Sequence, residues 1–280
     1  MTPGMDHAAR LRRVRAEMTA HGVDVVLLSV GSDLPWLVGY EAMPLERLTM
    51  LVVPVSGPVH LVVPRLEVPR VDDIGLFDVV GWEEHDDPVA IVADAVGGAA
   101  TVAVGDHTWS RFVLALQAAL PARRWLDAST VTAPVRSVKD ADEIDALARA
   151  AAAVDAIAAE MRERPFAGRT ERSVHHELVE RMLERGHQRS NFAIVAAGAN
   201  AASPHHEPGD RVIERGDVVL LDFGGRMQGY CSDITRMFHV GAVPAEVRDT
   251  YEVLAAANAA GVAAGRVGAP CSAVDAAARS

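Results

Sequence analysis

Apolar and polar positions follow two different periods along this chain, and the changes of period predict its helices and strands. Leu11, Val14 and Met18 recur at helical spacing and predict a helix over residues 7–21. Short β-prone apolar runs then alternate with helical patterns up to about residue 130, which is typical of an α/β domain. In this part we expect strands at 23–30, 48–54, 59–63, 77–82, 101–104 and 123–126, a helical turn at 33–40, and helices at 88–96 and 109–120.

A different order of elements follows. Residues 130–137, with Pro134 among them, are predicted to be a linker, and Ser137 is predicted to cap a long helix that ends at Pro165. We therefore expect two domains, an α/β domain over residues 1–132 and an α+β domain over residues 133–280. In the second domain we expect a helix at 170–186, strands at 191–197, 217–223 and 230–240, a helix at 244–265 and the start of another helix in the last ten residues.

Two aspartates in the second domain, Asp222 and Asp233, lie in or beside apolar runs and are eleven residues apart. A polar, glycine-bearing segment at 224–229 separates the runs, which predicts two antiparallel strands joined by a tight connection. With Met227 and Gln228 at the tip, the aspartates would be direct cross-strand partners, whose Cβ atoms lie roughly 4.5–5.5 Å apart.

Two carboxylates at that separation repel, and the pKa of one would be raised. One or two divalent cations of the Mg, Mn, Co and Zn range would remove the conflict, because such ions accept carboxylate oxygen ligands. An ion pair with Arg236 would also compensate the charge, so the spacing alone leaves both a metal site and a structural salt bridge open.

Several histidines are candidates for chemistry. His205 lies in a loop rich in Ser, Pro and Gly, where a histidine beside a metal can donate a hydrogen bond to a developing oxyanion or move a proton. The next residue, His206, is predicted to be an exposed loop residue. The run 175–177 begins like a zincin helix, but Glu180 stands where the second histidine would be, so we expect helix-surface residues there. His187 has no motif around it and is expected to be structural.

The composition excludes several classes of protein. The formal net charge is −11, which argues against nucleic acid or an anionic membrane as the main partner. Two cysteines without a CxxC or Cys/His cluster argue against a disulfide framework or a structural zinc site and favour a reducing, cytoplasmic location. We find no signal peptide and no apolar run near the ~18 residues of a membrane helix.

Taken together, the motifs of the second domain resemble the M24 metallopeptidase family of aminopeptidase P and prolidase. The resemblance rests on Pro204-His205, on Asp222 followed by Phe-Gly-Gly, on Gly229-Tyr230, and on Ser232-Asp233-Ile234-Thr235-Arg236, in this order and spacing. In the first domain, 33–40 is similar to the family's strand-turn signature. Residues 135–144 are similar to the opening of its catalytic domain.

This resemblance implies a creatinase-like N-terminal domain and a catalytic domain of the pita-bread fold. It also implies that Asp222 ligates one metal, that Asp233 bridges two, and that His205 contacts the substrate or the oxyanion. The metals would be two divalent ions, with manganese expected first and cobalt or zinc as alternatives. The implied reaction is hydrolysis of the peptide bond before proline, so the expected partner is a proline-containing peptide. We also note Tyr230 and Arg236 as further site residues.

The resemblance has a gap, because the family completes its site with one histidine and two glutamates for which this sequence shows no matching motif. We expect those ligands beyond Ser280, and the pita-bread domain and its site to be incomplete within these 280 residues. Two alternatives on the same fold stay open, a metal-free creatinase-like hydrolase and a non-catalytic binding module. The family also implies a homodimer, in which Trp36 would reach the neighbour's active site.

Overall fold

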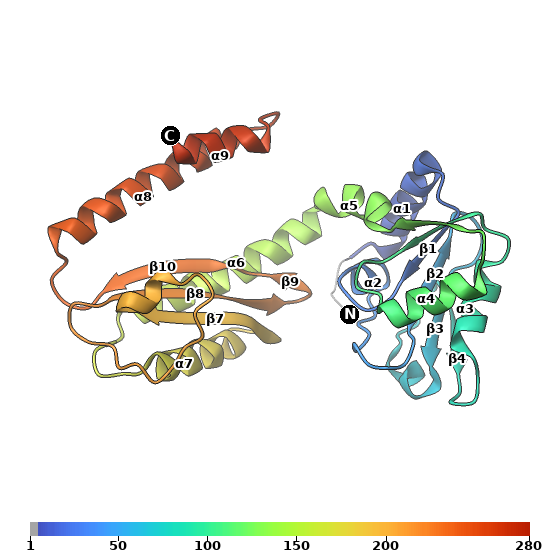
Figure 1. Cartoon of the computed structure of the whole chain (residues 1–280), viewed down its shortest axis with the longest axis horizontal. Coiled ribbons are helices and arrows are strands. Elements are labelled where there is room, and N and C mark those ends of the chain that lie inside the picture. Colours follow the sequence, from blue (N-terminus) through green and yellow to red (C-terminus); the bar gives the residue numbers. More distant parts are fainter. Residues whose placement is uncertain (1–4) are drawn as a thin grey trace. The chain divides into compact units, whose positions relative to one another are not determined.

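The computed structural model describes residues 5–280, which form two compact units (Figure 1). The first unit extends to Ala148 and includes Gln228–Tyr230, and the second contains Arg149–Met227 and Cys231–Ser280. The split falls inside a long helix, α6 (Ala141–Arg162). The boundary that we place between residues 132 and 133 stays a prediction.

The first unit is built on a mixed sheet of six strands in the order β4-β3-β2-β1-β5-β6. β1 pairs in parallel with β5 and antiparallel with β2, and β2 and β3 form the antiparallel hairpin that joins the two halves of the sheet. The elements are α1 (His7–His21), β1 (Val25–Leu28), α2 (Asp33–Val38), β2 (Met50–Pro54), β3 (His60–Pro64), β4 (Asp78–Trp82), α3 (Pro88–Val96), β5 (Thr101–Val104), α4 (Ser110–Ala119), β6 (Arg124–Asp127) and α5 (Ser129–Ser137).

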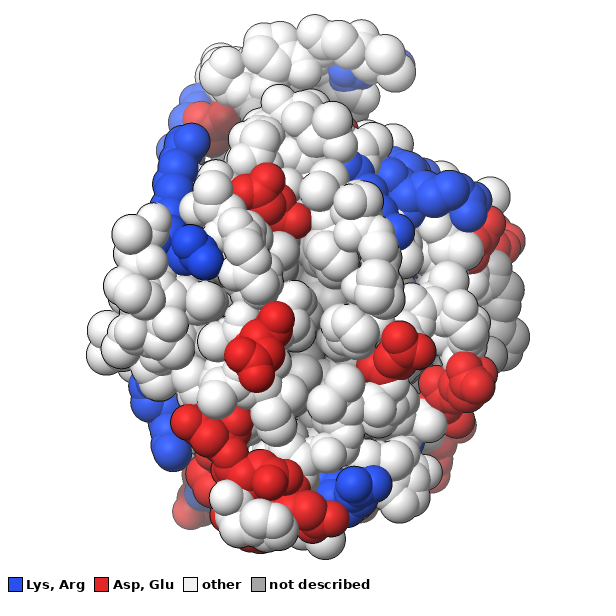
Figure 2. All heavy atoms as spheres, turned by 90° about the vertical axis from the view of Figure 1, so that its right-hand side faces the viewer, with Lys and Arg blue, Asp and Glu red and all other residues white. Residues whose placement is uncertain are grey.

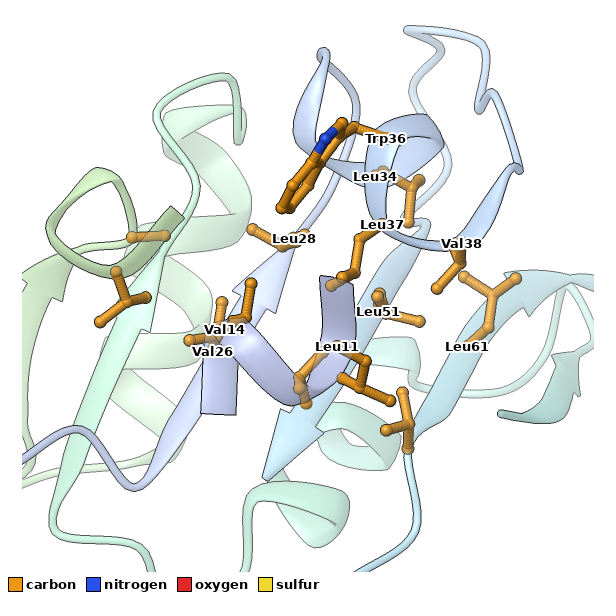
Figure 3. Close-up of a cluster of buried hydrophobic side chains, with 14 of the residues drawn as sticks. Leu11, Val14, Val26, Leu28, Leu34, Trp36, Leu37, Val38, Leu51 and Leu61 are labelled. Carbon is orange, nitrogen blue, oxygen red and sulfur yellow. The ribbon is translucent and has the colours of Figure 1, made fainter. Parts of the chain in front are cut away.

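Helices cover both faces of this sheet, which explains why its central strands are continuous apolar runs. In β1, Val26 and Leu28 pack on the face covered by α1 and α2, together with the side chains drawn in Figure 3. Val25 and Leu27 pack on the other face, against α3 and α4. Because successive strand residues point to opposite faces, one short strand contributes to two cores.

The predicted linker at 130–137 is wrong, since these residues form helix α5 with Pro134 inside it. Val131, Thr132 and Val135 are buried, so packing outweighs the hydrogen bond that proline removes.

The predicted cap of the following helix is also wrong by three residues. Asp140 and Glu143, rather than Ser137 and Asp140, form the reciprocal capping box: the Glu143 amide donates to Asp140 at 2.9 Å, and the Asp140 amide donates to Glu143 at 2.9 Å.

The second unit is built on a smaller antiparallel sheet in the order β10-β8-β7, with β9 paired to β8. Helices α6 and α7 pack on one face, where their apolar side chains share a core with Val219, Leu221 and Phe223 of β8. The elements after α6 are α7 (Glu171–Glu184), β7 (Arg189–Ala197), the 3-10 helix η2 (Gly198–Ala202), β8 (Val218–Met227), β9 (Tyr230–Cys231), β10 (Ile234–His239), α8 (Ala245–Ala264) and α9 (Cys271–Arg279).

The face shown in Figure 2 bears acidic residues among a mostly uncharged surface, and its basic residues lie toward the margins. Among residues 5–280, no helix is long and apolar enough to cross a membrane.

Candidate metal centre

The β8–β9 hairpin turns at Gln228 and Gly229, whose φ angles of 50° and 86° are those of a two-residue turn with both central residues left-handed. Our predicted tip at Met227 and Gln228 is therefore wrong by one residue. The shift moves the pairing by two residues, so Asp222 lies opposite Thr235 and not opposite Asp233. Glycine at the second turn position makes this turn favourable.

The two aspartates nevertheless share a face of the sheet. A shift of two residues preserves the side from which a strand side chain projects. Asp233 precedes Thr235 by two residues, so it is the diagonal neighbour of Asp222, and such neighbours have Cα atoms roughly 7–8 Å apart. The aspartates therefore project from the face opposite the α6–α7 core.

Thr235 fixes the Asp222 carboxylate. Its hydroxyl Oγ1 donates to Asp222 Oδ1 at 2.8 Å, across the pair of residues that lie directly opposite each other. Asp222 is half-buried, whereas Asp233 is exposed. One oxygen of Asp222 is thus restrained by the protein, while Asp233 presents its carboxylate to solvent.

Arg236 belongs to the other face. It pairs with Leu221, whose side chain lies in the α6–α7 core, and its guanidinium bonds to Asp155 of α6 at 3.1 Å. A salt bridge from Arg236 to the two aspartates, the alternative left open by the sequence, would require the side chain to cross the sheet. Arg236 therefore ties β10 to α6.

A buried hydrogen-bond network holds the strand break between β9 and β10, and the sequence patterns did not predict it. Ser232, which precedes Asp233, accepts from the Gly225 amide at 3.2 Å and lies 3.0 Å from His187 Nε2. His187 is buried, and desolvation lowers its pKa. The sheet backbones also approach closely here, because a Cβ added to Gly224 would overlap the carbonyl of Ser232. Our prediction that His187 is structural agrees with this position.

His205 and its neighbour have different environments. His205 is exposed in the loop between β7 and β8, and the contact with substrate or oxyanion that the family resemblance implies for it stays a prediction. The prediction that His206 is an exposed loop residue is wrong, because its Nε2 lies 2.8 Å from the completely buried Glu171 carboxylate. A local sequence motif could not have predicted the contact between Glu171 and His206, because 35 residues separate them.

Trp36 and Tyr230 meet in the first unit at the buried carboxylate of Glu143. The Trp36 indole donates to Glu143 Oε1 at 2.9 Å and the Tyr230 hydroxyl donates to the same oxygen at 2.8 Å. Arg10 pairs with Glu143 at 3.2 Å, and both side chains are only 3% exposed. Burial, and after it the bond to Glu143, raises the pKa of Tyr230 to about 12. The expected role of Trp36 in a neighbour's site stays a prediction.

On the sheet face opposite α6 and α7, the ligand atoms are of the type that a hard divalent ion binds, but there are too few of them among the described residues to hold one. Asp222 and Asp233 offer carboxylate oxygens from one face, which are ligands that Mn²⁺, Co²⁺ and Zn²⁺ accept. Within residues 5–280, however, no three His, Cys, Asp or Glu side chains come together to hold a metal ion. A complete site would need further ligands beside these two.

Comparison with known proteins places this arrangement in a family. The model of metallopeptidase family M24 matches residues 143–280, and that of the creatinase/prolidase N-terminal domain matches residues 10–138. The chain is 37% identical to a probable dipeptidase PepE of Mycobacterium tuberculosis, over 98% of this chain and 74% of that protein.

This chain belongs to metallopeptidase family M24.

Solved structures of relatives agree with this membership. The prolidase of Thermococcus sibiricus superposes with a TM-score of 0.92 at 31% identity, over 99% of this M24 chain and 77% of that one. The dipeptidase PepE of Mycobacterium ulcerans superposes with a TM-score of 0.86 at 37% identity, over 98% and 75% of the two chains. The predicted fold, a creatinase-like N-terminal domain followed by an M24 catalytic domain, is confirmed.

Proposed function

We propose that this protein is a metal-dependent peptidase that hydrolyses the bond before proline in short peptides. The observation that carries the proposal is the placement of Asp222 and Asp233 on one face of the β8–β10 pair, in a member of a metallopeptidase family. Relatives named dipeptidase and prolidase support a peptide substrate and the proline preference.

In this proposal each residue has a distinct task. Asp222 and Asp233 bind two divalent ions, with manganese the first candidate and cobalt or zinc the others. Thr235 holds the Asp222 carboxylate in one orientation, which limits the reorganisation needed on binding. Bound divalent ions supply Lewis-acid activation of water and of the scissile carbonyl. His205 donates a hydrogen bond to the oxygen on which negative charge develops.

Further ligands are required beside the two aspartates, and we propose that one histidine and two glutamates provide them. The protein is expected to act in the cytoplasm and as a homodimer. Its remaining site residues would be Tyr230, which fixes the end of the hairpin, and Arg236, which ties β10 to α6.

The test uses the full-length protein and pairs of dipeptides that differ only in having proline or alanine at the second position. We expect cleavage of the proline member, loss of activity with a chelator, and recovery with Mn²⁺, Co²⁺ or Zn²⁺. Asp233→Asn should lower kcat/KM about a thousandfold, because a Lewis acid contributes several kcal/mol to such a reaction.

Glu184→Gln is the control, since Glu184 is an exposed carboxylate of the same unit and belongs to α7, which packs on the opposite face of the sheet. It should keep its activity and metal content. Cleavage that survives chelation and Asp233→Asn would refute the metal-dependent assignment and favour a creatinase-like hydrolase. A full-length protein that cleaves no peptide would favour a binding module.

A further inference from the structure

Glu171, the first residue of α7, is a charged side chain with no exposed surface. Carboxylates are rarely buried completely, because a buried charge must be compensated by hydrogen bonds. Its position is also unusual for a core residue, since it lies at the start of the helix rather than on the α6–α7 core face. We therefore expect the Glu171 carboxylate to be held by hydrogen bonds inside the second unit.

Four donors satisfy this carboxylate. Oε1 accepts from the Ala197 amide at 2.8 Å and from Asn200 Nδ2 at 2.9 Å. Oε2 accepts from His206 Nε2 at 2.8 Å and from the Gly209 amide at 3.3 Å. Asn200, His206 and Gly209 belong to the connection between β7 and β8, and Ala197 is the last residue of β7. One carboxylate therefore fastens this connection at three points and at the strand end from which it starts.

The ionised form of Glu171 is the one that fits these bonds. Burial by itself raises the pKa of Glu171, but the bonds from His206, Asn200, Ala197 and Gly209 outweigh burial and hold the pKa below its usual value. An ionised carboxylate can only accept, so His206 Nε2 must carry a proton in this pair.

The far end of the connection has a second, independent attachment to α7. The Arg172 amide donates to the Gly209 carbonyl at 2.9 Å, and the Glu171 amide donates to the Arg211 carbonyl at 3.1 Å. The Arg172 side chain also pairs with Asp210 at 2.9 Å. Loss of the Glu171 carboxylate would therefore release mainly the part of the loop before Gly209.

That part contains His205. We infer that Glu171 is a positioning residue, which holds His206 against the start of α7 and so presents the adjacent His205 to the open side of the loop. His206 has 19% of its side chain exposed and is held at Glu171, whereas His205 is exposed. The inference rests on the proposed role of His205 in peptide hydrolysis.

A positioning role makes a prediction that a purely structural role does not. If Glu171 acts through His205, its substitution should matter only while His205 is present. In the full-length protein, Glu171→Gln keeps the side-chain volume but replaces one acceptor oxygen with an amide group. We expect kcat for a Xaa-Pro dipeptide to fall about tenfold to a hundredfold, with KM changed by less than about twofold.

The decisive measurement is the same substitution in a His205→Ala background. There, Glu171→Gln should lower kcat by no more than about twofold, because the positioned group is gone. Glu177→Gln is the matched control, since Glu177 is a partly buried carboxylate of the same helix whose partners are Arg169 and Arg181. It should leave kcat unchanged.

Amide hydrogen exchange gives a readout that does not depend on activity. Glu171→Gln should speed exchange in 197–209, where the Ala197 and Gly209 amides lose or weaken their acceptor, while Glu177→Gln should not. Unchanged exchange in this segment, or an equal loss of kcat with and without His205, would overturn the inference. A wild-type protein that cleaves no Xaa-Pro peptide would refute the proposed function instead, and the exchange result would still decide whether Glu171 holds the loop.

Discussion

Removal of the Glu143 carboxylate should destabilise the first unit more than any nearby surface substitution. Glu143 Oε1 lies 3.2 Å from Arg10 and accepts from the Trp36 indole and the Tyr230 hydroxyl, while Oε2 accepts from the Asp140 amide. Glu143→Ala would leave a guanidinium that is 3% exposed without this partner. It would also leave the buried Trp36 indole and the half-buried Tyr230 hydroxyl without this acceptor.

The expected cost follows from the burial of this pair. Breaking a buried ion pair by removing one partner typically costs about 3–5 kcal/mol, because the remaining charge stays desolvated. Asp140 also lies 3.4 Å from Arg10 and is more exposed, so it can compensate part of the charge. We therefore expect about 3 kcal/mol, which lowers the folded-to-unfolded ratio about a hundredfold.

Tryptophan fluorescence during urea unfolding is a suitable assay, because all four tryptophans of the sequence lie in the first unit. Asp142→Ala is the control, since Asp142 is an exposed carboxylate in the same first turn of α6. Its loss removes only a favourable interaction with the helix dipole, worth about 0.3–1 kcal/mol. If Glu143→Ala costs no more than Asp142→Ala, the buried cluster does not stabilise the unit as argued.

Two further substitutions test the hairpin. Burial, and after it the bond to Glu143, raises the pKa of Tyr230 from 10.0 to about 12. The resulting stability is present below pH 10 and is lost as the pH rises from about 10 to about 12; because the side chain is only part-buried and solvent screens it, we expect a loss of about 1–2 kcal/mol. Tyr230→Phe should lack this loss in fluorescence-monitored unfolding, and an identical alkaline profile for both proteins would contradict the assignment. Gly224→Ala should cost about 3 kcal/mol or more, because its Cβ would overlap the Ser232 carbonyl. Gly98→Ala, which has open space around it, should cost little in the same circular-dichroism melts, and equal melting temperatures would show that the sheet can relax around Gly224.

The sequence predicted the elements well where burial alone determines the pattern. The helix at 88–96 and the strand at 101–104 have the bounds of α3 and β5, because α3 presents an apolar face to one core and β5 is buried between two. Helix α5 was predicted as a linker because Pro134 is a strong local signal against a helix. The packing that stabilises α5 comes from distant residues, such as Arg13, which donates to the Val135 carbonyl.

In the hairpin, the alternation of apolar and polar residues predicts which side chains share a face of the sheet, but not which residues pair across it. The prediction that Asp222 and Asp233 are direct partners is wrong, but alternation in β8 and β10 still places them on one face, because an error of one residue in the tip shifts the pairing by two. The pairing itself depended on whether Gln228 adopts a positive φ, which the residue type does not strongly favour. Thr235, not Asp233, is therefore the direct partner of Asp222.

Asp222, Asp233 and His205 lie beside polar groups that the fold holds in place, and of the three side chains Asp222 is the one hydrogen-bonded to such a group among the residues that the structure describes. Thr235 bonds to Asp222 directly, the buried Ser232 precedes Asp233, and His206 beside His205 is fixed by Glu171. Two carboxylates on one face repel each other, so an unrestrained pair would turn apart when no cation lies between them. In the proposed metal site, restraints built into the fold would offset that repulsion before a metal binds, and they would oppose the reorganisation that weakens binding. The partners that supply two of them, His187 and Glu171, lie 45 and 35 residues away from the groups they hold. A short motif can therefore name the ligands, but only the folded chain shows what keeps them in place.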